Sequence, residues 1–358
     1  MSKIEFGIVG GAGWRAEFYL RIAAALPERF HITGMVVRNE EKACGVESAW
    51  GVRTYRTIDE MLRAGAPAFV VTSVPWAANP AVICELTARQ VPVLSETPPA
   101  RDVSEMTGLV DFIRTGAKIQ VAEQYPFQPL HAARIAVARS GRLGTVTQAQ
   151  VSACHGYHGM VLMRRLLGIE CENVAITARR FKSPLVAGPG RNGPPKEEKV
   201  GDSAQDIAWL EFEGKLGVFD FTGDQYFSWI RSPRLLVRGE RGEINNEELR
   251  WLADYLTPMQ CRFERVNAGE NGNLEGYYLK GIRAGAEWVY RNPFTPGRLT
   301  DDEIAVATCL EKMSAYAAGG HAFYGLREAC QDHYLNLMIA QAIKSGQTVR
   351  TETQPWAT

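Results

Sequence analysis

The regular alternation of apolar strand patterns with helical stretches in the first third of the chain constrains its fold most. Ile4 to Val9 has the pattern of a strand covered on both faces of a parallel sheet. Similar runs follow at Ile32 to Val37, Ala68 to Val74 and Val91 to Ser95, and segments with helical spacing lie between them. Strands that alternate with helices in this way predict a doubly wound parallel sheet with right-handed crossovers. We therefore expect an α/β domain over residues 1–122.

The rest of the chain, residues 123–358, predicts a second domain of a different kind. A chain of 358 residues is too long for one ordinary compact domain, and two prolines in the segment 124–129 are typical of a crossing between domains. From Val146 to Gly239, longer strand patterns joined by short turns predict an α+β domain with an open, mainly antiparallel sheet. The stretch 183–199 is rich in proline and glycine and predicts a loop. The apolar spacing over 323–345 predicts a long terminal helix, which is a candidate to pack back on the first domain.

Composition and charge argue against several classes of protein. The 40 basic and 40 acidic side chains cancel, so the net charge gives no reason to expect nucleic acid or an anionic membrane as a partner. No apolar run reaches the ~20 residues of a membrane helix, and the charged N-terminus is unlike a signal peptide, so we expect a cytoplasmic protein. Seven scattered cysteines without a CxxC pair predict neither a disulfide framework nor a structural zinc site.

A glycine-rich segment, Gly10-Gly11-Ala12-Gly13-Trp14-Arg15-Ala16, directly follows the first predicted strand. Its frame Gly11-x-Gly13-x-x-Ala16 fits the dinucleotide-binding fingerprint, in which backbone N–H groups approach a pyrophosphate at the N-terminus of the next helix. A tight turn without a ligand is the alternative. The position between a strand and a helix favours a site for NAD or NADP.

The end of the second predicted strand bears on the choice between NAD and NADP. An acidic residue there would hydrogen-bond the ribose 2′-hydroxyl, whereas an arginine accommodates a 2′-phosphate. This sequence has Arg38 and Asn39 at that point, with no acid before Glu40. Arg38 therefore favours NADP(H) slightly, with a surface arginine at a helix start as the alternative.

Further segments stand in the order found in a known enzyme family. These segments are the glycine loop, Ser95-Glu96-Thr97-Pro98, Gly156-Tyr157-His158 before 164–168, the stretch 209–214, and Gln331-Asp332-His333-Tyr334. On them the chain resembles, over nearly its whole length, the glucose–fructose oxidoreductase, inositol dehydrogenase and rhizopine catabolism (Gfo/Idh/MocA) family. The resemblance implies an N-terminal Rossmann domain and hydride transfer between NAD(P) and a hydroxyl or carbonyl of a sugar, sugar derivative or polyol. The residues expected to contact the cofactor are Gly10, Gly11, Ala12, Gly13, Trp14, Arg15, Arg38, Ser73, Pro75, Trp76, Glu96, Thr97 and Gln124.

Two positions depart from the family pattern. The family usually has Glu-Lys-Pro where this chain has Glu96-Thr97-Pro98, so the lysine cation that stabilises a developing alkoxide is missing. An aspartate often stands four residues before the pocket histidine, and this chain has Cys154 there. These losses keep two alternatives open. One is a redox-neutral, NAD-dependent enzyme that cleaves glycosides, and the other is a non-catalytic regulatory protein that binds dinucleotide or sugar.

His158 matches the pocket histidine of the family and is the candidate general acid/base for a substrate hydroxyl. We expect Tyr157 and His155 beside it as further catalytic residues. The residues expected to line the substrate pocket are Tyr125, Cys154 and Trp76. In the alternative interpretation, His155 and His158 form a capping pair at the start of a helix. Because no third ligand follows at a fixed spacing, we expect no metal site.

The open sheet of the second domain predicts self-association. An antiparallel sheet covered on one face leaves the other exposed, and a partner normally buries such a surface. We therefore expect a homo-oligomer, a dimer or tetramer, packed through the strands of 146–154 and 206–239.

Overall fold

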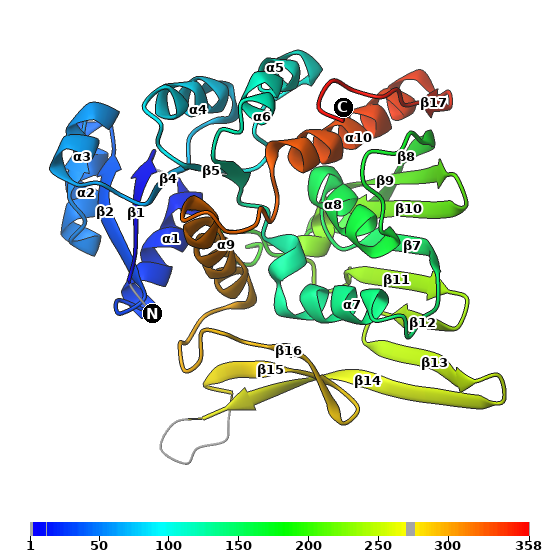
Figure 1. Ribbon diagram of the computed structural model, residues 1–358. Helices are drawn as coiled ribbons and strands as arrows, with labels where there is room; N and C mark the ends of the chain where they lie inside the picture. The colour runs from blue at the N-terminus through cyan, green and yellow to red at the C-terminus, as the bar shows by residue number, and fades with distance from the viewer. Residues whose placement is uncertain (1–2, 12, 270–275, 358) are drawn as a thin grey trace.

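The computed structural model describes residues 3–11, 13–269 and 276–357, and these form two β-sheets flanked by helices (Figure 1). The first sheet has six parallel strands in the order β3-β2-β1-β4-β5-β6. Its strands are β1 (Ile4–Val9), β2 (Phe30–Val36), β3 (Thr54–Tyr55), β4 (Phe69–Thr72), β5 (Val93–Ser95) and β6 (Ile119–Val121). Its crossovers are α1 (Trp14–Ala25), α2 (Glu40–Trp50), α3 (Ile58–Ala64), α4 (Asn79–Ala88), α5 (Val103–Gly108) and α6 (Val110–Arg114). This strand order is that of the Rossmann fold, which confirms the predicted α/β class.

The central strands of the first sheet are largely apolar because helices cover both faces. On one face, Phe6 of β1 is buried in a cluster with Leu20 of α1 and Leu310 of α9 (Asp301–Ala317), a helix from far along the chain. On the other face, Val70 of β4 is buried with Ile83 of α4. The helix α9 was not among the predicted elements, although it closes the core under β1 and β4.

The second sheet has eleven strands in the order β16-β15-β14-β13-β12-β11-β7-β10-β9-β8-β17. The strands are β7 (Val146–Ser152), β8 (Ala175–Val186), β9 (Val200–Phe212), β10 (Lys215–Thr222), β11 (Arg234–Gly239), β12 (Gly242–Asn245), β13 (Glu248–Asp254), β14 (Thr257–Ala268), β15 (Tyr278–Ala284), β16 (Glu287–Arg291) and β17 (Val349–Arg350). Every neighbouring pair is antiparallel except β7 and β10, which run parallel. A mainly antiparallel open sheet is therefore confirmed.

One predicted loop is shorter than expected. The stretch 183–199 was predicted as a loop, but β8 continues to Val186 because it pairs in register with β9 as far as Val200. Pro184 fits this position since β17 pairs with β8 only at Ala175 and Ile176, which leaves the proline on an edge.

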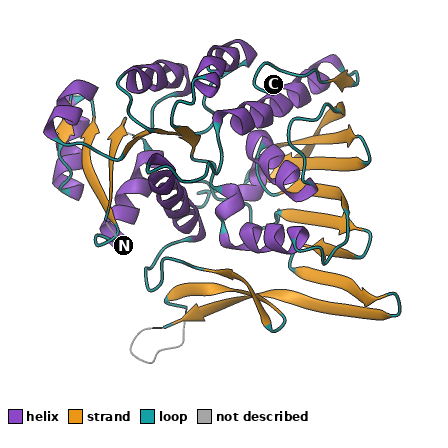
Figure 2. Cartoon of the chain, viewed as in Figure 1, coloured by secondary structure: helices purple, strands orange, loops and turns teal. Residues whose placement is uncertain are grey.

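Three helices lie along one face of the second sheet, as Figure 2 shows. They are α7 (Pro129–Arg139), α8 (Gly156–Leu167) and α10 (Leu326–Ser345). The last of these also contacts the first sheet, because the backbone N–H of Val121 donates to the carbonyl oxygen of Tyr324 at 2.8 Å and Leu326 is buried against that domain. The two sheets are thereby joined, with the ends of β5 and β6 facing α8.

Two kinds of feature are absent from the part of the chain that the structure describes. No helix there combines the length and the apolar character needed to cross a bilayer. In the same residues, no group of three or more His, Cys, Asp or Glu side chains is placed to hold a metal ion.

Candidate active site

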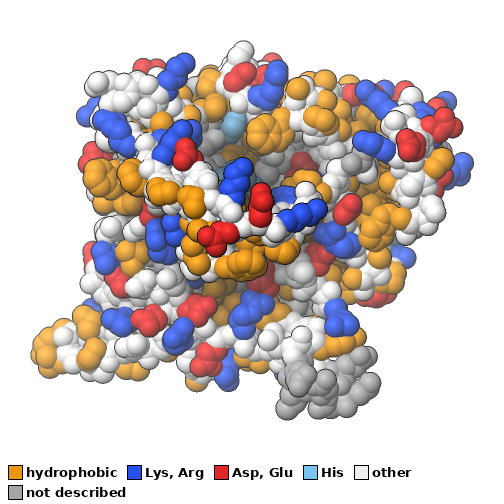
Figure 3. All heavy atoms as spheres, turned by 180° about the vertical axis from the view of Figure 1, so that it is seen from behind, with side chains coloured by type: hydrophobic (Ala, Val, Ile, Leu, Met, Phe, Trp, Pro, Cys, Tyr) orange, Lys and Arg blue, Asp and Glu red, His pale blue; other side chains and the backbone are white. Residues whose placement is uncertain are grey.

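A cavity of about 900 Å³ lies at the carboxyl ends of β1, β4 and β5, where the first domain meets α8 and the second sheet. Ligands of doubly wound sheets bind at this edge, next to the point where the strand order reverses. The predicted residues that line the cavity are Gly10, Gly11, Gly13, Trp14, Arg15, Ser73, Pro75, Trp76, Glu96, Thr97, Gln124, Tyr125, His155 and His158. Figure 3 shows a hollow on the face opposite to that of Figure 1, with a histidine side chain visible in it.

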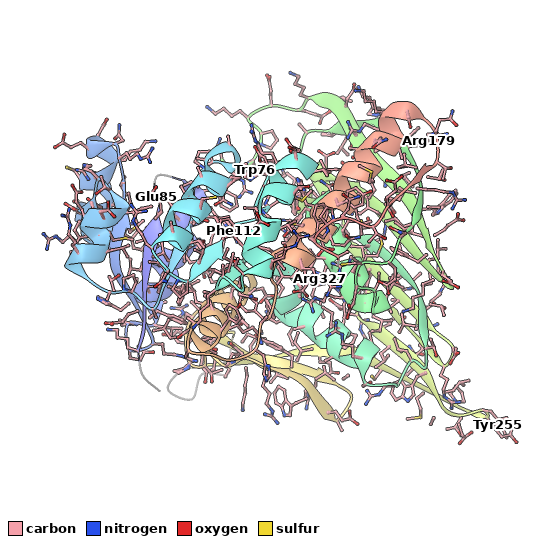
Figure 4. The ribbon with its side chains drawn as sticks, turned by 45° about the horizontal axis from the view of Figure 1, so that its top comes forward. Trp76, Glu85, Phe112, Arg179, Tyr255 and Arg327 are labelled. Carbon is pink, nitrogen blue, oxygen red and sulfur yellow. The ribbon has the colours of Figure 1, made fainter. Side chains whose placement is uncertain are left out.

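Three of the predicted site residues that the structure describes do not line the cavity. Arg38 is exposed just after β2, and Tyr157 and Cys154 are buried behind the cavity wall. Ala12 lies outside the described residues. Trp76, labelled in Figure 4, lines the cavity from the N-terminal end of α4 and is 58% exposed.

The glycine loop has the shape that a pyrophosphate requires. Gly10 has φ +91°, and a Cβ atom there would lie 2.1 Å from the carbonyl oxygen of Ser73, so only glycine fits. At Gly13 a Cβ atom would meet nothing within 4 Å, which leaves open space in front of α1. Gly13 is the N-cap of this helix and has no side chain to cap it. The Ala16 N–H donates to the Gly13 carbonyl oxygen at 3.0 Å, while the N–H groups of Trp14 and Arg15 have no acceptor among the described residues and remain available for an anion.

Arg15 is held at the wall of the cavity by two residues that were predicted to contact the cofactor. Its Nε atom donates to Glu96 Oε1 at 2.8 Å, and its Nη2 atom donates to Gln124 Oε1 at 2.7 Å. Tyr19, which the sequence analysis did not identify, also donates its hydroxyl to Glu96. Burial, with the Glu96 charge beside it, raises the pKa of Tyr19 well above its ordinary value, so this hydroxyl keeps its proton. The Arg15 charge is therefore balanced by Glu96, and Thr97 next to it contributes no cation.

The centre of the site is a hydrogen-bonded pair, His158 and Glu123. His158 belongs to the first turn of α8, and Glu123 follows β6 with a fully buried side chain. Glu123 Oε2 lies 2.6 Å from Nδ1 of His158, while its Oε1 accepts the backbone N–H of Tyr125 at 3.0 Å. A carboxylate at Nδ1 places the proton there and leaves the lone pair of Nε2 available on the other side of the ring. Nε2 has no hydrogen-bond partner among the described residues.

Glu123 and Tyr226 are the residues closest to the two histidines that the sequence analysis missed. The position of Glu123, directly after a parallel strand, was a usable signal, because side chains at the carboxyl end of such strands face the ligand. Tyr226 follows β10 in a short turn and carries no comparable local signal.

Two tyrosines form the wall next to the histidines. The Tyr125 ring lies 4.5 Å from the His158 ring between centroids, and its hydroxyl is 3.3 Å from that of Tyr226. The Tyr226 hydroxyl in turn accepts the backbone N–H of His155 at 2.9 Å and lies 2.6 Å from His155 Nδ1. Burial and the neighbouring His158 lower the pKa of His155 to about 4, so this ring is neutral near pH 7. The alternative of a capping pair is wrong, because the side chain of His155, at the N-cap of α8, makes no capping bond.

The hydroxyl of Tyr157 faces away from the cavity. It lies 3.0 Å from the Tyr324 hydroxyl, which donates to Asp332 Oδ2 at 2.8 Å. Asp332 in turn forms a buried ion pair with Arg164 at 2.8 Å. Tyr157 therefore packs behind His158, with ring centroids 5.2 Å apart, and its hydroxyl supports the fold of α8 and α10.

Cys154 is fully buried beside the same pair. Burial and the Glu123 charge raise the pKa of its thiol well above the usual value, so the sulfur stays protonated. A protonated, buried thiol is a poor nucleophile and a poor metal ligand.

The loop between β8 and β9 reaches across the mouth of the cavity. Its Arg191 guanidinium lies 3.9 Å from the centre of the Trp14 ring and 5.6 Å from that of Phe227. Trp14 belongs to the first domain and Phe227 to the second, so Arg191 contacts both sides of the opening.

The fold and the glycine loop are those of a Rossmann-type dinucleotide-binding domain, and His158 lines the same cavity as that loop. Residues 4–123 match the model described as "Oxidoreductase family, NAD-binding Rossmann fold", the Gfo/Idh/MocA family. The match covers the N-terminal domain and confirms the predicted resemblance to a family of NAD-binding oxidoreductases. The sequence has no match among curated proteins.

Solved structures of low sequence identity share the fold over the whole chain. An NAD binding oxidoreductase from Klebsiella pneumoniae is 15% identical, with a TM-score of 0.70 over 98% of this chain and 100% of that chain. A levoglucosan dehydrogenase in complex with NADH and levoglucosan is 15% identical, with a TM-score of 0.69 over 97% and 99%. An oxidoreductase from Agrobacterium radiobacter in complex with NAD+, L-tartaric acid and magnesium is 15% identical, with a TM-score of 0.67 over 97% and 98%.

Proposed function

We propose that this protein transfers a hydride between a nicotinamide dinucleotide and a hydroxyl or carbonyl group of a sugar, sugar derivative or polyol, with His158 as general acid/base. The observation that carries the proposal is the Glu123–His158 pair, whose free Nε2 lies in the same cavity as the glycine loop. A base in hydrogen-bond reach of the carbinol proton and an acceptor of its hydride are the two requirements of alcohol oxidation.

Different residues of the cavity would bind the cofactor, move the proton and bind the substrate. The N-terminus of α1 and the open space at Gly13 would hold the pyrophosphate, and Thr97 and Trp76 would flank the nicotinamide end, where the bound cofactor supplies hydride chemistry. His158 Nε2 takes the hydroxyl proton, and Glu123 balances the charge of the imidazolium. In place of the missing family lysine, that imidazolium is the cation that faces the reacting oxygen. Tyr125 and Tyr226 offer hydroxyls to the rest of the substrate.

The choice of a sugar or polyol rests on the polar cavity wall and on the ligands of similar structures. Histidine, tyrosine and glutamine side chains around His158 suit a molecule with several hydroxyl groups. The levoglucosan dehydrogenase of similar fold was solved with a sugar derivative bound. For the cofactor, the exposed guanidinium of Arg38, without an ion-pair partner among the described residues, supports NADP(H) over NAD(H).

The uncovered face of the second sheet supports a homo-oligomer as the working form. Large apolar side chains on β8 and β9 and in the segment that precedes β11 are exposed, namely Phe181, Ile207, Trp209, Trp229 and Ile230. Contiguous exposed apolar surface of this kind marks interaction sites. Light scattering of the purified protein measures the stoichiometry, and Trp209→Lys is expected to shift it toward the monomer.

The first test is a titration with NADH and NADPH that follows the fluorescence of the reduced nicotinamide. Binding of one form in the micromolar range is expected, after which the oxidised form and a panel of sugars and polyols are assayed with the wild type and His158→Gln. Absence of binding by folded protein free of copurified dinucleotide would refute the proposal and favour a regulatory role. Cleavage of glycosides without accumulation of reduced cofactor would instead indicate the redox-neutral reaction.

A further inference from the structure

A second cavity, of about 720 Å³, adjoins the candidate active site on the side of α7. Tyr125, Tyr226 and Asp302 line both cavities. The Tyr125 ring separates two histidines, with its centroid 4.5 Å from that of His158 and 6.3 Å from that of His131 in the second cavity. A ligand that presents a hydroxyl to His158 therefore has room to extend past Tyr125.

Arg134, on α7, presents a buried guanidinium to this second cavity. The residue is 7% exposed, its Nε donates to the carbonyl oxygen of Asn246 at 2.8 Å, and its Nη1 lies 3.4 Å from Nδ1 of His131. Burial lowers the pKa of Arg134 to about 10, so the group is still charged at neutral pH. Among the described residues, no carboxylate forms an ion pair with it and no acceptor binds its Nη2.

The other arginines and most of the carboxylates around the cavity are already balanced. The pairs are Arg234 with Asp220, Arg262 with Glu247, Arg265 with Asp301, and Arg250 with Glu248. The exception, Asp302, accepts the amide of Gln128 at 2.7 Å and lies at the boundary with the active site. Arg134 is therefore the cavity-lining arginine that has no ion-pair partner among the described residues. The charge of Glu247 acts on it, but Glu247 is itself paired with Arg262, and a buried cation without an anion of its own is costly.

His131 supplies a second donor beside Arg134. Burial and the Arg134 charge lower the pKa of His131 to about 3, so its ring is neutral. Because Nδ1 faces the guanidinium as an acceptor, the ring proton sits on Nε2, which has no partner among the described residues. One helix thus offers a guanidinium and an imidazole N–H to the same space.

We propose that Arg134 and His131 bind a carboxylate of the substrate, so that the sugar is an acid, such as a uronate or an aldonate. The inference rests on the proposed function, since it places this carboxylate in the molecule whose hydroxyl reacts at His158. A guanidinium fork matches the two oxygens of a carboxylate, and one unmatched cation suits one negative charge. A phosphate dianion would leave a further charge unbalanced close to Asp302.

Calorimetric titration of the protein saturated with reduced cofactor tests this inference. The probes are D-glucuronate, D-galacturonate and D-gluconate, their neutral counterparts D-glucose, D-galactose and D-glucitol, and D-glucose 6-phosphate. At least one acid is expected to bind about tenfold to a hundredfold more tightly than its neutral counterpart. Arg134→Gln is expected to abolish that difference, Arg134→Lys to keep part of it, and the matched control Arg139→Gln, an exposed arginine on the same helix, to keep all of it.

Three outcomes would overturn the assignment: no acid binds better than its neutral counterpart, Arg134→Gln keeps the preference, or the phosphate binds most tightly. Failure of the proposed function would look different. If the acids bind through Arg134 but no hydride is transferred in the presence of NAD+ or NADP+, the carboxylate site stands and the oxidoreductase proposal does not. If a neutral sugar is oxidised faster than its acid, the oxidoreductase proposal stands and the carboxylate site does not.

Discussion

Replacement of Glu123 by glutamine tests the central hydrogen bond with almost no change in volume. The Tyr125 backbone N–H, 3.0 Å from Oε1, requires an acceptor, so the glutamine oxygen is expected to stay at that position. Its amide N–H₂ group then faces Nδ1 of His158, where Oε2 now lies at 2.6 Å. Nδ1 must become the acceptor, the ring proton moves to Nε2, and the lone pair that would take the substrate proton is lost.

The expected effect on catalysis is large and the effect on folding small. A positioned general base contributes about 10²- to 10⁴-fold to the rate, or about 3 to 5 kcal/mol of barrier, so kcat/KM should fall within that range. Exchanging a charge-assisted hydrogen bond for a neutral one is expected to change the free energy of unfolding by about 1 to 2 kcal/mol. The dissociation constant for NADH should stay within about twofold, because Glu123 does not line the cofactor cavity.

Two measurements on Glu123→Gln check the reasoning. Steady-state kinetics at saturating cofactor give kcat/KM, and ¹⁵N NMR of histidine-labelled protein reports the tautomer of His158 directly. Glu85→Gln, a half-buried residue of α4 that is labelled in Figure 4 and pairs with Arg89 far from His158, is the control for the lost charge. Unchanged kcat/KM, or a His158 proton that remains on Nδ1 in Glu123→Gln, would refute the proposed role of the pair.

Three further predictions concern the glycine loop, a buried histidine and the loop over the mouth. Gly10→Ala should lower the free energy of unfolding by about 3 kcal/mol through its contact with Ser73, which thermal melts measure. Gly13→Ala should fold normally but weaken NADH binding about tenfold, which fluorescence titration measures. Burial and the Arg134 charge lower the pKa of His131 to about 3, so the contribution of the neutral ring to stability is complete above about pH 6.5 and falls by about 2 kcal/mol as the pH drops to about 5. Denaturation of the wild type and of His131→Gln at several pH values should show that the free energy of unfolding of the wild type falls by about 2 kcal/mol more over this range. An equal pH dependence in the two proteins would contradict this prediction. Arg191→Ala removes the cation over Trp14 and should weaken NADH binding about two- to fivefold, while an unchanged affinity would place Arg191 outside the cofactor site.

The sequence predicted the first domain well because its signals are local. Apart from the two-residue strand β3, the strands of the parallel sheet lie in largely apolar runs, and segments with helical spacing separate these runs. The glycine loop directly follows β1, so neighbouring residues in the sequence were enough to predict a turn at Gly10 and Gly13. The antiparallel character of the second sheet was also predicted, from strand pairs joined by short turns. The short strand β3, the strands from β12 to β17 and helix α9 were not identified.

The sequence by itself predicted a Rossmann domain, a glycine loop with the dinucleotide-binding pattern and a histidine that matches the pocket histidine of the family. Only the tertiary structure decided which partners these residues have. His158 meets Glu123 from 35 positions away, His155 meets Tyr226 from 71 positions away, and Arg134 meets Asn246 from 112 positions away. Periodicity reports which face of a strand or helix is buried, but it carries no information on which distant side chain lies opposite. That choice depends on how the two sheets pack through α8, α9 and α10, and it directs Tyr157 into the core and leaves Arg134 without a carboxylate.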